Sequence, residues 1–150
     1  MQRYNSSEKF QSSGPPSVSA CLSVCFRCKP ADWSGSDDAR PGAALAAGLA
    51  GLIASRGSDG VAMREIRCLS QCKRPCVVAF SGEGRFTYLF GDLDPIRDVH
   101  AVLDAFALYL ASPEGFMERR DRPEALRAGI LGRVPPLGST HPIVQTARLA

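Results

Sequence analysis

Two pairs of cysteines, each following a short apolar run, constrain the fold of this chain more than any other sequence feature. Cys25 and Cys28 follow the first run, and Cys68 and Cys72 follow a later one. Both runs are typical of β-strands. Loops that follow two parallel strands leave a sheet at the same edge. Four thiols placed there can converge on one point, as a metal ion or an iron–sulfur cluster requires.

Length and composition are those of one modest domain. The chain has 150 residues, of which 45% are hydrophobic, an ordinary share for a globular protein. The longest apolar stretch, residues 43–54, is about a dozen residues long and too short to span a membrane. The N-terminus lacks the apolar segment of a secretory signal. We therefore expect a cytoplasmic protein whose six cysteines are ligands or redox groups rather than disulfides.

The formal charge of +3 does not indicate binding to nucleic acid. The excess of basic residues is small and scattered along the chain. Its one dense basic run, Arg119, Arg120 and Arg122, is interrupted by Asp121. Mixed charge runs are typical of solvated loops, so we predict a loop there.

The first half of the chain predicts a strand, a helix and a second strand. The strands cover residues 18–24 and 61–67. The helix begins at Pro41, has Leu45 and Leu49 on one face, and ends before Gly57. A strand, helix and strand in this order form a right-handed crossover with parallel strands.

The second half predicts an antiparallel hairpin and another helix. Strands over 77–81 and 85–90 are joined by a glycine-containing turn. Asp94 is the predicted N-cap of the second helix, and Pro95 is its predicted first residue. The apolar stripe of this helix comprises Ile96, Val99, Leu103, Phe106 and Leu110.

The resulting order, β-α-β-β-β-α, is that of a thioredoxin-like α/β sandwich with a mixed sheet and an irregular C-terminal tail. We predict a disordered segment over 1–17, one domain over 18–136 and a tail over 137–150. A short helix is expected over 123–128. The Arg-Val-Pro-Pro segment, residues 133–136, is expected to be extended and to pack against the sheet edge.

Three chemistries suit the cysteines. The first is a [2Fe–2S] cluster held by Cys25, Cys28, Cys68 and Cys72. The second is a tetrahedral zinc ion bound by the same four thiolates, in a structural or metal-handling protein. The third is thiol–disulfide exchange at Cys25 and Cys28, because a C-x-x-C after the first strand is the redox position of a thioredoxin-like fold. The third leaves Cys68 and Cys72 unexplained.

The segment Cys-Leu-Ser-Gln-Cys at 68–72, followed by proline and an apolar strand, resembles the second cysteine pair of thioredoxin-like [2Fe–2S] ferredoxins. With the early C-x-x-C, the Tyr-x-Phe-Gly-Asp-Leu stretch at 88–93 and the late Arg-Val-Pro-Pro, the chain more narrowly resembles a bacterial family of predicted metal-binding proteins. The first pair departs from the ferredoxin pattern, which separates its first two ligands by more residues than the two found here.

The resemblance implies a [2Fe–2S] electron carrier with Cys25, Cys28, Cys68 and Cys72 as cluster ligands and no substrate chemistry of its own. It also implies a redox partner protein, a homodimer, and a setting in cobalamin or other metal-cofactor metabolism. No membrane or nucleic-acid partner is expected.

The remaining candidates have other predicted roles. Cys21 lies inside the first predicted strand and is expected to be a packing residue, as is Cys76, which would also place a fifth thiol near the site. The cations that flank the pairs should stabilise a negatively charged cluster and favour an acidic partner surface; they are Arg27, Lys29, Lys73 and Arg74. Neither His100 nor His141 is expected to bind metal.

Overall fold

The computed structural model describes residues 19–57 and 61–149. The regular elements are β1 (Ala20–Cys25), η1 (Asp37–Ala39), α1 (Pro41–Arg56), β2 (Ala62–Ile66), β3 (Val78–Gly82), β4 (Thr87–Phe90), α2 (Val99–Ala111), η2 (Pro113–Gly115), η3 (Arg119–Asp121), α3 (Glu124–Ala128) and β5 (Ile130–Val134). The segment predicted to be disordered, 1–17, lies outside the described residues. No helix within the described ranges is long and apolar enough to cross a membrane.

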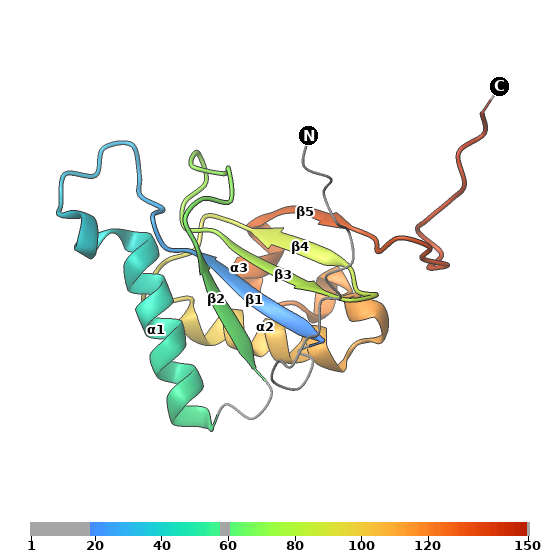
Figure 1. Ribbon diagram of the computed structural model, residues 1–150, viewed down its shortest axis with the longest axis horizontal. Coiled ribbons are helices and arrows are strands. Elements are labelled where there is room, and N and C mark those ends of the chain that lie inside the picture. The colour runs from blue at the N-terminus through green and yellow to red at the C-terminus, as the bar shows by residue number, and fades with distance from the viewer. Residues whose placement is uncertain (1–18, 58–60, 150) are drawn as a thin grey trace, which may run out of the picture.

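The sheet has five strands in the order β2-β1-β3-β4-β5 (Figure 1). β1 and β2 are parallel, with Cys25 opposite Ile66 at their ends. All other neighbouring strands are antiparallel. α1 forms the crossover that a parallel pair needs. The two cysteine-bearing segments therefore leave the sheet at the same edge, as the sequence predicts.

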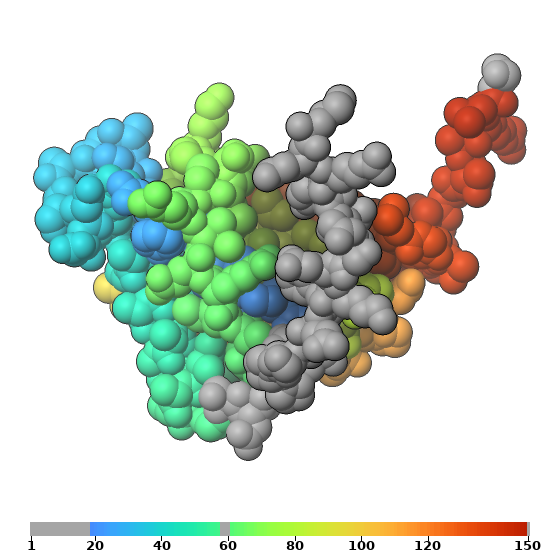
Figure 2. Space-filling model, viewed as in Figure 1, coloured from blue at the N-terminus to red at the C-terminus, as the bar shows by residue number. Residues whose placement is uncertain are grey.

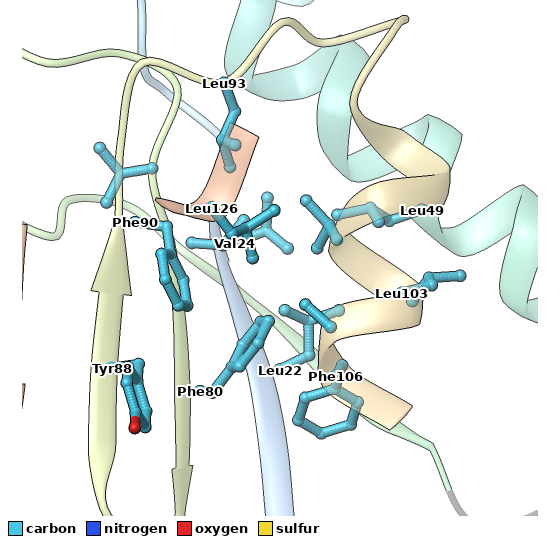
Figure 3. Packing of buried hydrophobic residues seen from close by; sticks show 14 of the residues in the cluster. Leu22, Val24, Leu49, Phe80, Tyr88, Phe90, Leu93, Leu103, Phe106 and Leu126 are labelled. Carbon is cyan, nitrogen blue, oxygen red and sulfur yellow. The ribbon is translucent and has the colours of Figure 1, made fainter. Parts of the chain in front are cut away.

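A core of aromatic and aliphatic side chains joins the sheet to the helices. Phe80 on β3 packs against Phe90 of β4 and against Phe106 and Tyr109 of α2, with ring centroids 5.2, 5.1 and 5.5 Å away. Figure 3 shows these strands directing their side chains toward α2 and toward Leu49 of α1. Burying one such side chain contributes about 1.5–3 kcal/mol, so this cluster fixes the helices on the sheet.

The first turn of α1 packs directly on the loop that follows β1. The backbone N–H of Gly42 donates a hydrogen bond to the Cys28 carbonyl oxygen at 2.9 Å. A Cβ atom at position 42 would collide with the carbonyl oxygen of Cys25 and lie 2.7 Å from the backbone nitrogen of Cys28. A residue without a side chain is therefore needed here for the helix to approach this loop so closely.

The predicted strands and the first helix are confirmed, with ends shifted by one or two residues. β1 extends through Cys25, so this cysteine belongs to the sheet rather than to the loop after it. The predicted short helix is α3. The Arg-Val-Pro-Pro segment begins within β5, which pairs antiparallel with β4 at the sheet edge. The expectation of an extended edge segment is thus confirmed, and the sheet gains a fifth strand.

The predicted start of the second helix is wrong. α2 begins at Val99, and residues 95–98 form a turn before it. The Asp94 carboxylate accepts hydrogen bonds from the backbone N–H groups of Ile96 and Arg97 at 2.9 and 2.7 Å. It therefore stabilises the turn instead of capping the helix. Ile96 is consequently 82% exposed and lies outside the apolar stripe. The buried residues of α2 are Val99, Val102, Leu103, Ala105, Phe106 and Tyr109.

The basic run before α3 is only partly solvated, which corrects a second prediction. Arg119 and Arg120 are exposed, but Arg122 is buried and donates a hydrogen bond from Nη1 to the Leu126 carbonyl oxygen at 3.3 Å. Burial lowers the pKa of its guanidinium. This arginine is therefore packed inside the molecule and bonded to the backbone of α3, rather than facing solvent.

Alanine in place of glycine usually stabilises a helix, but at position 42 we expect it to destabilise the protein. Gly42→Ala should destabilise the protein by about 1–3 kcal/mol, because the added methyl group meets backbone atoms that cannot move aside. Gly51→Ala lies in the same helix, and the methyl group added there would meet no other atom within 4 Å. This second change should be neutral or stabilise by up to about 1 kcal/mol. Urea unfolding of both variants measures the difference. Equal stabilisation by both would contradict the described contact.

Candidate functional site

Both predicted cysteine pairs lie where β1 and β2 reach their C-terminal ends, away from the edge strand β5. We call residues 25–28 the first cysteine loop and residues 67–76 the second cysteine loop. Cys25 is the last residue of β1, and its ladder partner Ile66 is the last residue of β2. Cys68 follows two positions later. The parallel register thus brings together two loops that are distant in the sequence.

The first cysteine loop is a tight, buried turn. The Cys28 backbone N–H donates to the Cys25 carbonyl oxygen at 3.5 Å, and α1 covers the turn through Gly42. Cys25 and Cys28 are 2% and 4% exposed. The pKa of the Cys28 thiol is well above its ordinary value, first because of burial and then because it hydrogen bonds to Cys25 and is repelled by its charge. These two sulfur atoms therefore form a close pair.

The second cysteine loop presents its pair to solvent. Cys68 and Cys72 are both exposed. The backbone N–H of Ser70 donates to the Cys68 Sγ at 3.2 Å. This hydrogen bond, followed by one from Cys72, lowers the pKa of Cys68. The pKa of Cys72 is raised by the same thiol–thiol interaction. Cys68 and Cys72 thus form a second close pair.

The two cysteine loops interact with each other where β1 and β2 end. The Cys25 thiol donates to the carbonyl oxygen of Arg67, at the start of the second loop, with a separation of 3.8 Å. When Cys25 is ionised instead, its negative charge adds to the causes that raise the pKa of Cys72. The sulfur atoms are therefore arranged as two neighbouring pairs. Within the part of the chain that the structure describes, no three or more metal-binding side chains form a group that could hold one ion.

A turn after β4 braces the end of the second cysteine loop. The Asp92 backbone N–H donates to the Arg74 carbonyl oxygen at 2.9 Å, and the Arg74 guanidinium Nε donates to the Asp92 carboxylate at 2.6 Å. A Cβ at Gly91 would lie 2.6 Å from the same carbonyl oxygen, so this approach requires glycine. Gly91 and Asp92 belong to the Gly-Asp-Leu stretch, which stands out in the sequence only as part of the family resemblance. The position of this stretch directly after a strand is the sequence feature that indicates its structural role.

The two other cysteines occupy different surroundings. Cys76 is 2% exposed, as predicted for a packing residue, and burial followed by the charge of Cys25 raises its pKa to about 12. It precedes Val77, whose carbonyl oxygen accepts a hydrogen bond from the Cys25 backbone at 3.0 Å. A fifth thiol therefore lies near the first pair. Cys21 is half-buried within β1 rather than fully buried.

Neither histidine belongs to this region. His100 lies on the exposed side of α2, where its Nδ1 is 3.0 Å from Arg56. His141 stacks on Phe116 with a centroid separation of 4.1 Å, so it is half-buried rather than exposed.

A family model described as "Protein of unknown function (DUF1636)" matches residues 22–136. No curated protein matches the chain. Among solved structures, the fold is similar to that of a thioredoxin-like [2Fe–2S] ferredoxin from Aquifex aeolicus, with a TM-score of 0.52 and 16% sequence identity. The similarity covers 82% of this chain and 99% of that chain. The predicted thioredoxin-like fold class is therefore confirmed.

The thiols of the metal-free protein should react with iodoacetamide in a fixed order. Thiolate is the reactive form, so near pH 7.5 a lowered pKa increases reactivity and a raised pKa decreases it. Cys68, which is exposed and has a lowered pKa, should react at least about tenfold faster than Cys28 and Cys76. Peptide mass spectrometry of timed samples measures the order. Equal rates at Cys68 and Cys28 would contradict the described burial.

Proposed function

The chain belongs to the DUF1636 family, and we propose that it is an electron carrier that binds a [2Fe–2S] cluster. Cys25, Cys28, Cys68 and Cys72 would hold the cluster. When bound, such a cluster accepts and releases one electron without forming or breaking bonds in a substrate. The protein would therefore serve a redox partner and carry out no substrate chemistry of its own.

The arrangement of the cysteines as two close pairs carries this proposal. A [2Fe–2S] cluster has two irons and takes four cysteine thiolates, so two thiolates are available to each iron. A structural zinc ion also takes two cysteine pairs, but it draws all four sulfur atoms to about 2.3 Å from one point. Cys25 with Cys28, and Cys68 with Cys72, provide one pair on each of two adjoining loops. The donor set and its pairing thus fit a two-iron cluster.

The surroundings of the two pairs suit a negatively charged centre. The Ser70 N–H already donates to the Cys68 sulfur, and the second cysteine loop carries Arg67, Lys73 and Arg74. Hydrogen bonds to sulfur and nearby cations stabilise the added electron and raise the reduction potential. The chain would thus hold the cluster from a buried side and modulate its charge from an exposed side.

The solved structure with the similar fold is that of a thioredoxin-like [2Fe–2S] ferredoxin. At 16% identity the likeness establishes the fold alone. It supports the proposal because the same fold accommodates such a cluster in that protein. The cluster and its role in this chain rest on its own cysteine pairs.

Thiol–disulfide exchange at Cys25 and Cys28 fits the geometry less well. Redox-active thiols are partly exposed and have a lowered pKa. Both of these cysteines are at most 4% exposed, and the pKa of Cys28 is raised. A protein disulfide could not reach either sulfur atom without opening the loop.

Protein purified without oxygen should be red-brown and contain about two irons and two acid-labile sulfides per chain. Metal analysis and the visible spectrum measure this directly. A colourless protein with about one zinc per chain would contradict electron transfer and would favour a structural or metal-handling zinc site.

Substituting cysteines one at a time should distinguish the cluster ligands from the other cysteines. Cys72→Ser should lose most of the visible absorbance and iron, because one iron loses a thiolate. Cys21→Ser and Cys76→Ala serve as matched controls and should retain both. Retention of the full spectrum by Cys72→Ser, or its loss in Cys21→Ser, would show that the ligands are assigned wrongly.

A further inference from the structure

We propose that residues 67–74, the outer part of the second cysteine loop, form the docking surface for an acidic partner protein. This inference rests on the proposed function, because it names the chemistry of the partner that would exchange electrons at the same site. Three features of the described residues support it: the unequal exposure of the cysteine pairs, the positive charge of the second loop, and the balanced charge of the stretch that follows the first loop.

The two cysteine pairs differ sharply in their access to solvent. Cys25 and Cys28 lie beneath the first turn of α1 and are almost completely buried. Cys68 and Cys72 are exposed on a loop that projects at the top of the view, in green (Figure 2). A partner can therefore approach the site closely over the second loop, whereas α1 blocks the approach to the first pair.

The second loop carries only positive charge. Residues 67–74 contain Arg67, Lys73 and Arg74 and no acidic residue. Asp92 neutralises Arg74 through an ion pair of 2.5 Å. Arg67 and Lys73 are exposed and form no ion pair with any other residue that the structure describes. These two cations can attract an acidic surface and guide it to the exposed thiols.

The stretch after the first loop has balanced charge instead. Asp32, Asp37 and Asp38 are exposed there, and Arg27, Lys29 and Arg40 match them in number. Asp37 is held by Arg40 at 2.5 Å and lies 3.8 Å from Arg27, so these two cations are already engaged. An acidic partner is thus attracted by residues 67–74 more strongly than by the stretch after the first loop. This asymmetry favours one orientation of the partner.

Protection of the exposed thiols by a charged polymer tests the proposal on the metal-free full chain. Poly-L-glutamate is the acidic probe, and neutral iodoacetamide reports access to Cys68 and Cys72 by mass spectrometry. At low salt, poly-L-glutamate should slow alkylation of both cysteines at least about threefold, whereas poly-L-lysine should not. At about 0.5 M salt the protection should disappear, because screening shortens the reach of the loop cations.

Two double variants of equal charge change identify the surface. Arg67→Glu/Lys73→Glu should abolish protection, whereas Arg119→Glu/Arg120→Glu, at exposed positions on η3, should retain it. Absence of protection in the unchanged protein, or equal protection in both variants, would overturn the proposal. Stronger protection by a DNA oligonucleotide of equal total charge would also overturn it, in favour of a nucleic-acid ligand.

Iron content separates this proposal from the proposed function. Neither Arg67 nor Lys73 is a proposed cluster ligand, so their double variant should still bind iron, although the loss of two nearby cations should lower the reduction potential of the cluster. Lost protection in a variant that still binds iron supports a docking surface distinct from the ligands. Unchanged protein that binds no iron would contradict the proposed function, but the protection assay, which uses the metal-free chain, would still decide whether residues 67–74 bind an acidic surface.

Discussion

The parallel pairing of β1 with β2 is the constraint on which the candidate site depends. It places Cys25 opposite Ile66 and brings together two loops that are far apart in the sequence. The pairing requires the crossover helix α1, whose core-facing leucines fix its position on the sheet. A slip of one residue in this register would turn the side chains of β2 to the opposite face and shift the second loop along the sheet edge. The site is therefore a direct consequence of the strand order.

Two braces hold the loops once the strands have placed them. Gly42 lets the first turn of α1 rest on the loop that contains Cys25 and Cys28. Gly91 packs against Arg74 near the far end of the second loop, and Asp92 forms hydrogen bonds with the same arginine. The first brace buries one cysteine pair, whereas the second lets the other pair project into solvent. This difference gives the proposed cluster one protected side and one side open to a partner.

The sequence was sufficient to predict that the two cysteine loops leave the sheet at the same end, because strand order and the handedness of crossovers follow from local patterns. The extended segment at residues 133–136 was expected too, but no local pattern indicated the fifth strand in which it begins. The unequal burial of the two pairs could not be predicted, because it depends on a tertiary contact between α1 and the first cysteine loop. The turn before Val99, with its exposed Ile96, and the buried Arg122 likewise reflect tertiary contacts that override propensity and charge pattern. The contact between Arg74 and Asp92 could not be predicted either, because local sequence patterns do not show which distant residues will meet.

The most direct test of the central claim is electron paramagnetic resonance of the protein purified without oxygen and then reduced with dithionite. A [2Fe–2S] cluster held by the two cysteine pairs predicts no signal before reduction and about one unpaired electron per chain after it. A reduced sample that stays silent while metal analysis finds about one zinc per chain would contradict the account, because the four thiols would then surround a single redox-inactive ion.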